Sequence, residues 1–153
     1  MMKEGLDRVF RENFNETPRF FRAPGRINLI GEHTDYNDGS VLPAGINKYC
    51  SIAIAPSAKK TSHIIALDLQ DQISFDDAPE KPSSPHWVNY IWGVMQAFKK
   101  KNCMVPSFDA VIQSDIPVGA GLSSSAALEV VFAKAFNEIF QFHLSEMELT
   151  WIA

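Results

Sequence analysis

Apolar and polar residues alternate along the first half of the chain in the way that is typical of β-strands. The pattern predicts short strands at residues 19–22 and 49–55, and a hairpin from residues 63–69 and 72–75. The following segment, residues 76–85, holds three prolines and predicts a loop. The first half of the chain is therefore expected to form most of a sheet.

Apolar residues recur at three- and four-residue spacing in the second half, which predicts helices. Residues 87–101 follow this spacing, and so does a longer segment at residues 124–140, with a candidate strand at residues 108–114 between them. The lysines at 99–101 suit the negative end of a helix dipole. Strands followed by helices predict an α+β domain, in which a mixed β-sheet carries its helices on one face.

A further helix start is predicted by Ser145 and Glu148, whose spacing is that of a capping box. The sequence ends at Ala153, about two turns later, on the apolar residues Trp151 and Ile152. A capped helix that stops on apolar residues lacks the packing partner that these residues need. We therefore expect residues 1–153 to be an incomplete part of a larger domain.

Composition narrows the class of protein. The 14 basic and 18 acidic residues give a formal net charge of −4, and 46% of the residues are hydrophobic, as in a soluble globular domain. The mild acidity argues against nucleic acid or an anionic membrane as a partner. The sequence has no apolar run near the roughly 18 residues of a membrane span, no secretion signal, and only two widely separated cysteines. A cytoplasmic location is expected.

The strongest chemical signal is the segment 117–127, which reads PVGAGLSSSAA. Glycines allow tight bends and close approach to a ligand, serines cap the N–H groups of a helix start, and that start attracts anions. The segment lacks the lysine of a Walker A loop, and Ser124 replaces the third glycine of a dinucleotide fingerprint. A plain glycine turn with a serine cap remains an alternative, but three consecutive serines exceed what one cap requires and favour phosphate binding.

A second polar cluster lies in the segment 23–39. Glu32, His33 and Asp35 fall within four residues, between Gly31 and Gly39. Each carboxylate has two oxygens and can accept hydrogen bonds from a pair of vicinal hydroxyls, which suits a sugar. A nearby arginine at position 26 has the forked donors that neutralise phosphate. A solvated loop is the plain alternative, and a single histidine without HExxH spacing argues against zinc.

Together, the two segments resemble the GHMP small-molecule kinases. Residues 25–37, which read GRINLIGEHTDYN, are similar to the galactokinase signature, and residues 119–126 resemble the ATP-binding loop of the family. The resemblance implies that residues 1–153 form the N-terminal domain of a GHMP kinase, with the sugar signature at 23–43 and the phosphate loop at 117–127. It spans nearly all of the chain.

The resemblance also implies a role for each matched residue. Arg26 would stabilise the transition state of phosphoryl transfer, and the galactose hydroxyls would bind to Glu32, His33, Thr34 and Asp35. The ATP phosphates would lie against Gly119, Ala120, Gly121, Leu122, Ser123, Ser124 and Ser125. Magnesium would be coordinated by Ser125, or alternatively by Ser124.

The implied activity is the ATP-dependent phosphorylation of D-galactose at its anomeric hydroxyl, which gives galactose 1-phosphate. The family also uses a glutamate as a second Mg²⁺ ligand and an aspartate base, and both come shortly after the region where this sequence ends. We therefore expect the chain alone to be inactive and to need a C-terminal portion or another chain. A non-catalytic regulatory relative or fragment that binds galactose and ATP is the alternative function. N-acetylgalactosamine is an alternative substrate, although residues 38–43 favour galactose.

Overall fold

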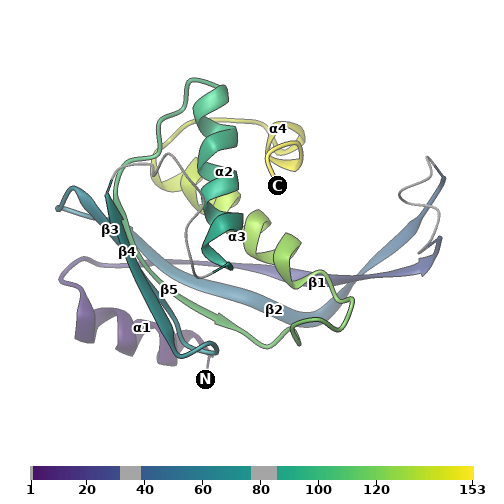
Figure 1. The fold of residues 1–153 in the computed structure, drawn as a ribbon, viewed down its shortest axis with the longest axis horizontal. Coiled ribbons are helices and arrows are strands. Elements are labelled where there is room, and N and C mark those ends of the chain that lie inside the picture. The colour runs from purple at the N-terminus through teal and green to yellow at the C-terminus, as the bar shows by residue number, and fades with distance from the viewer. Residues whose placement is uncertain (1, 32–38, 77–85) are drawn as a thin grey trace.

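A computed structural model of the chain describes residues 2–31, 39–76 and 86–153. In these residues a five-stranded sheet, in the order β1–β2–β5–β3–β4, carries helices on both faces (Figure 1). The elements in chain order are α1 (Met2–Asn13), β1 (Arg19–Ile30), β2 (Leu42–Pro56), β3 (Thr61–Ala66), β4 (Asp71–Asp76), α2 (Val88–Lys100), β5 (Phe108–Ser114), α3 (Ser124–Ile139) and α4 (Glu146–Thr150).

The sheet is mixed, as the sequence predicts. The pairs β1–β2, β2–β5 and β3–β4 are antiparallel, whereas β3 and β5 are parallel. The strands at 19–22 and 49–55 are longer than predicted, because β1 and β2 continue as a long hairpin from the pair Arg19–Ile54 to the pair Ile30–Leu42. The first part of the sugar signature therefore lies on an edge strand of the sheet.

The two faces of the sheet carry different helices, because successive side chains of a strand point to opposite faces. Ile52 and Ile54 belong to the core under α2 and α3, whereas Ala53 and Ala55 pack with Phe10 of α1. The prediction that the helices lie on one face is wrong for α1, which covers the opposite face in Figure 1. The small alanines leave the room that the Phe10 ring occupies on that face.

The main core consists largely of aromatic rings between the sheet and the two long helices. The ring of Phe136 on α3 lies 4.9 Å from that of Phe108 on β5 and 6.1 Å from that of Phe98 on α2. All three side chains are fully buried. Burial of a phenylalanine side chain contributes about 1.5–3 kcal/mol, so this cluster fixes how α3 crosses the sheet. Consequently the core also sets the position of the first turn of α3.

The two predicted long helices and the predicted hairpin are confirmed. Helices α2 and α3 differ from their predicted bounds by only one residue at an end, and the predicted hairpin is formed by β3 and β4, with Gln70 at a φ of 50° in its turn. In the ranges 2–31, 39–76 and 86–153, no helix combines the length and the apolar character that crossing a membrane would require.

The predicted capping box at the start of α4 is present. Glu148 N donates to Ser145 Oγ at 3.3 Å, and Ser145 N donates to Glu148 Oε2 at 3.0 Å. Lys101 Nζ also donates to Glu148 Oε1 at 3.1 Å, which joins α4 to the end of α2. The hydrogen bonds from Ser145, followed by that from Lys101, lower the pKa of Glu148 from 4.5 to about 2.

We predict a pH dependence of α4 that follows from this lowered pKa. A group whose pKa is lower in the folded state stabilises the protein above its unfolded pKa of 4.5, and this contribution is lost as the pH falls towards 2. In urea unfolding measured between about pH 5 and pH 2, Glu148→Gln should flatten the loss of stability. Glu146→Gln, which removes a charge from the same turn but keeps the capping box, should leave the pH profile as it is. Identical profiles for the two variants would contradict the prediction.

Candidate active site

The two predicted functional segments lie side by side. Arg26 N donates to Leu122 O at 3.1 Å, and Ser123 Oγ donates to Arg26 O at 3.4 Å across 97 positions of sequence. Gly25 allows this contact, because an added β-carbon would lie 2.8 Å from Leu122 O and 3.1 Å from the Ile46 side chain. The fold thus brings the glycine–serine loop against the strand that carries the sugar signature.

The loop has the backbone that its glycines predict. Gly119 and Gly121 have φ angles of 76° and 69°, values that favour glycine. Ser123 precedes α3 in the left-handed conformation, and its side chain makes no capping hydrogen bond. The alternative of a serine cap is therefore wrong for Ser123, since its hydroxyl donates to Arg26 O instead.

The missing cap leaves donors at the start of α3. The first hydrogen bond of the helix runs from Ala127 N to Ser123 O at 3.0 Å. The three preceding N–H groups, of residues 124–126, have no acceptor in the described parts of the chain. A helix N-terminus carries a partial positive charge, so these N–H groups form an anion-binding position next to the loop.

A cleft of about 740 Å³ opens from this loop across the sheet towards α2. One side is polar and contains the loop glycines and residues 123–125, while the other side is aromatic and is formed by Trp87 and Tyr90 of the α2 region. Cys50 and Ile112 contribute from the strands. The cleft therefore joins an anion-binding end to an aromatic end, and its volume is in the usual range for a site that binds small molecules.

Trp87 is held in the cleft wall by a hydrogen bond that the sequence did not indicate. Its indole Nε1 donates to Asp71 Oδ2 at 2.9 Å, and Gln72 N donates to Asp71 Oδ1 at 2.8 Å. Asp71 opens β4, so a residue of the hairpin orients an aromatic ring at the start of α2. The three-residue spacing of Trp87 and Tyr90 is the only sequence signal for this wall, and it is also the spacing of core positions.

Two further groups of the cleft escaped the sequence analysis. Asp68 as a residue is exposed, yet partial burial of its carboxyl group raises its pKa, although Ser114 N donates a hydrogen bond to it. Cys50 is buried beside it, and burial followed by the charge of Asp68 raises the pKa of the Cys50 thiol to about 12. Cys50 is therefore a neutral thiol at neutral pH and lines the cleft as a small apolar group.

The remaining predicted site residues divide into two groups. Arg26 is described: its backbone contacts the loop and its side chain is exposed. Glu32, His33, Thr34 and Asp35 lie outside the described residues. Strand β1 ends at Ile30, and Gly31 follows with a φ of 92°.

Two protein-family models match this chain, one over each functional segment. Residues 8–56 match the galactokinase galactose-binding signature, and residues 89–153 match the N-terminal domain of the GHMP kinases. The two matches cover more than half of the chain and include both functional segments. The chain belongs to the GHMP kinase family and carries the galactokinase galactose-binding signature. The loop at residues 117–127 lies within the range that matches the GHMP kinase N-terminal domain.

Individual relatives agree with this assignment. A galactokinase of Thermotoga neapolitana is 45% identical over 132 residues, which are 86% of this chain and 36% of the relative. The crystal structure of Lactococcus lactis galactokinase complexed with galactose has a TM-score of 0.90 at 33% identity, over 99% of this chain and 41% of that chain. Mevalonate kinase of Methanococcus jannaschii, at 19% identity, shares the fold with a TM-score of 0.78 over 91% of this chain and 45% of that chain.

The chain thus spans 36% of the length of the curated relative that it matches.

We predict that Gly25→Ala separates the two functional segments. The added β-carbon meets a backbone oxygen at 2.8 Å, so the loop must shift, and overpacking of this kind costs about 1–3 kcal/mol. Urea unfolding should show this loss, and backbone amides of residues 119–123 should exchange faster with deuterium. Gly45→Ala is a matched control on the opposite strand, where the nearest atom to an added β-carbon is 3.8 Å away. Equal losses in the two variants would exclude the proposed close contact.

We predict that Asp71→Ala frees the indole of Trp87. The loss of one hydrogen bond of about 1.4 kcal/mol corresponds to roughly a tenfold faster exchange of the indole N–H proton. Nuclear magnetic resonance can follow this proton separately from those of the other two tryptophans. Asp76→Ala, which removes an acceptor for Thr61 Oγ1 at the other end of β4, should leave the exchange rate of Trp87 unchanged. An unchanged rate in Asp71→Ala would show that the bond does not hold the ring.

Proposed function

We propose that this chain supplies the ATP-binding part and the sugar signature of an enzyme that transfers the γ-phosphoryl group of ATP to the anomeric hydroxyl of D-galactose. The observation that carries the proposal is the backbone contact of Arg26 with Leu122 and Ser123. It brings the strand that leads into the galactose signature against the phosphate-binding loop. Phosphoryl transfer depends mainly on positioning and charge neutralisation, and this contact serves positioning.

ATP suits the two ends of the cleft. The backbone N–H groups at the start of α3, together with those of Gly119 and Gly121, are donors for the phosphate oxygens. At the other end, the rings of Trp87 and Tyr90 provide flat apolar surface for the adenine base. The ribose then spans the floor near Cys50, which as a neutral thiol does not repel the phosphates.

Galactose is proposed as the sugar because the matched signature is that of galactokinases, and because the similar Lactococcus lactis galactokinase was crystallised with galactose. In this proposal the sugar hydroxyls bind to the side chains that follow β1, at Glu32, His33, Thr34 and Asp35. Arg26, which precedes them on β1, neutralises negative charge that develops on the transferred phosphoryl group.

A magnesium ion fits the polar end of the cleft. Mg²⁺ commonly takes one or two protein oxygens and completes its shell with phosphate and water oxygens. Ser124 and Ser125 line the cleft and offer hydroxyl oxygens, and we assign the ion to Ser125 or alternatively to Ser124. Within the described ranges no three histidine, cysteine or acidic residues gather into a metal site. In this proposal, phosphate and water oxygens and the glutamate that the resemblance implies complete the shell. When bound, the ion neutralises phosphate charge.

Binding and turnover are separable in this proposal. Transfer also requires a base that accepts the proton of the sugar hydroxyl. The resemblance assigns this role to an aspartate for which residues 1–153 hold no counterpart. The chain alone is therefore expected to bind ATP and galactose without releasing ADP.

Titration calorimetry with Mg-ATP and with galactose, together with an ADP-release assay, tests the proposal. Ser124→Asp places a carboxylate at the first position of α3, where it favours the helix but repels phosphate. This variant should fold normally, lose at least about tenfold in ATP affinity, and keep its galactose affinity. Ser74→Asp makes the same charge change at an exposed position of β4 and should bind ATP as the unmodified chain does. Unchanged ATP affinity in Ser124→Asp would refute the phosphate position.

A further inference from the structure

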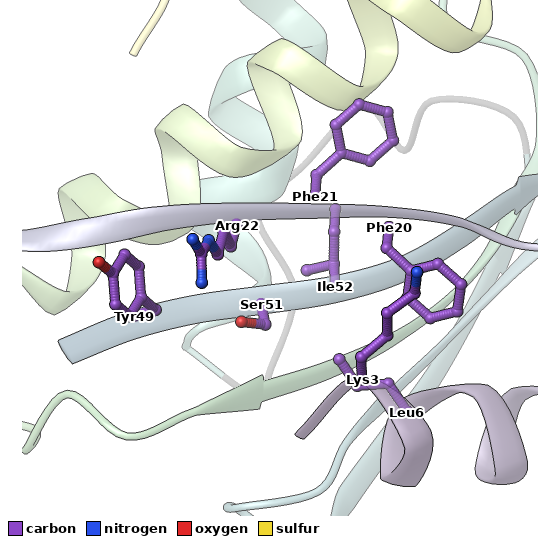
Figure 2. Close-up of a pocket in the computed structure, with 8 residues that line it drawn as sticks. All are labelled: Lys3, Leu6, Phe20, Phe21, Arg22, Tyr49, Ser51 and Ile52. Atoms are coloured by element: carbon purple, nitrogen blue, oxygen red, sulfur yellow. The ribbon is translucent and has the colours of Figure 1, made fainter. Parts of the chain in front are cut away.

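A second cavity lies on the other face of the sheet. This groove, of about 430 Å³, runs between the first turns of α1 and the strands β1 and β2 (Figure 2). Cys50 of β2 lines the ATP cleft, whereas its neighbours Tyr49 and Ser51 line the groove. The two cavities are therefore separated by the thickness of the sheet, and the groove is independent of the kinase site.

Two cationic side chains line the groove, and each lies over an aromatic ring. The Arg22 guanidinium lies 4.6 Å from the centre of the Tyr49 ring, and the Lys3 ammonium lies 4.9 Å from the centre of the Phe20 ring. Within the described parts of the chain, neither cation has a carboxylate within 4.0 Å, although the protein carries a net charge of −4. Stacking on a ring orients a cation without neutralising its charge.

A serine hydroxyl lies between the two cations. Ser51 is only 8% exposed and is the cross-strand neighbour of Arg22. Figure 2 shows it between the Arg22–Tyr49 pair and the Lys3–Phe20 pair. Its hydroxyl has no hydrogen-bond partner among the residues that the structure describes. No buried side-chain polar atom among the described residues lacks a partner, so this hydroxyl is open to the groove and can donate to a ligand oxygen.

We propose that this groove binds a phosphate monoester with a small ring as its organic part. Two positive charges match a dianion, the forked donors of Arg22 match phosphate oxygens, and Ser51 donates a third hydrogen bond. The Tyr49 and Phe20 rings flank the organic part, and Leu6 supplies an apolar surface beneath it. A carboxylate of the same size offers only one charge to the two cations and fits less well.

The test is a titration of the 153-residue chain with phenyl phosphate, followed by nuclear magnetic resonance of the backbone amides. Resonances of residues 20–22 and 49–52 and of the first turns of α1 should shift, with a dissociation constant below about 1 mM. Benzoate and inorganic phosphate should each bind at least about fivefold more weakly. Equal affinity for benzoate would overturn the requirement for a dianion, equal affinity for inorganic phosphate would overturn the role of the ring, and an absence of shifts would overturn the site.

Variants separate the groove from the kinase site. Arg22→Gln should weaken phenyl phosphate binding at least about tenfold, and Ser51→Ala about fivefold. Arg19→Gln is the matched control, because Arg19 lies on the same strand and stacks on Phe21 but pairs with Glu138 at 2.6 Å; it should leave the affinity unchanged. Ser124→Asp, which blocks the phosphate end of the cleft, should also bind phenyl phosphate normally. A loss of the groove shifts in Ser124→Asp would place the probe in the ATP cleft and refute the proposal.

Discussion

One backbone contact holds the candidate active site together: Arg26 on an edge strand donates to Leu122 in the loop before α3. The contact joins main-chain atoms, so it depends on how closely the two chain segments approach and not on the chemistry of any side chain. Gly25 permits that approach because it has no β-carbon. The glycine–serine loop and the strand that carries the first part of the sugar signature are therefore placed by a steric requirement at a single position.

The aromatic core fixes α3 against the sheet, and so contributes to the position of this contact. Phe136 of α3 packs against Phe108 in the sheet and Phe98 in α2, and these rings fix the start of the helix against the strands. Ser123 adopts a left-handed conformation there, which costs about 1–2 kcal/mol for a residue other than glycine. Its hydroxyl gains a hydrogen bond to Arg26 O, and the N–H groups that it would otherwise cap stay available for an anion. The strain at Ser123 and the N–H groups that stay without a cap thus share one cause.

The sheet separates two binding surfaces of different chemistry. The cleft under α2 and α3 relies on N–H groups and a helix dipole, whereas the groove beside α1 relies on the side-chain charges of Lys3 and Arg22. Strand alternation produces this division, since consecutive residues of β2 face opposite ways. In a chain that spans 36% of its curated relative, both cavities are formed within the described residues.

The sequence by itself determined the helices α2 and α3, the capping box at Ser145 and the positive φ of the loop glycines, because each depends on residues within one or two turns. The sequence analysis missed α1, although its apolar residues Leu6, Val9 and Phe10 recur at helical spacing. It also did not predict the Asp71–Trp87 bond, which joins a hairpin to a helix. The local rule also assigned a cap to Ser123, and a contact with Arg26, 97 positions away, overrode it. Only the tertiary structure decided these features, because hydrogen bonds between distant segments exist only after the core has brought those segments together.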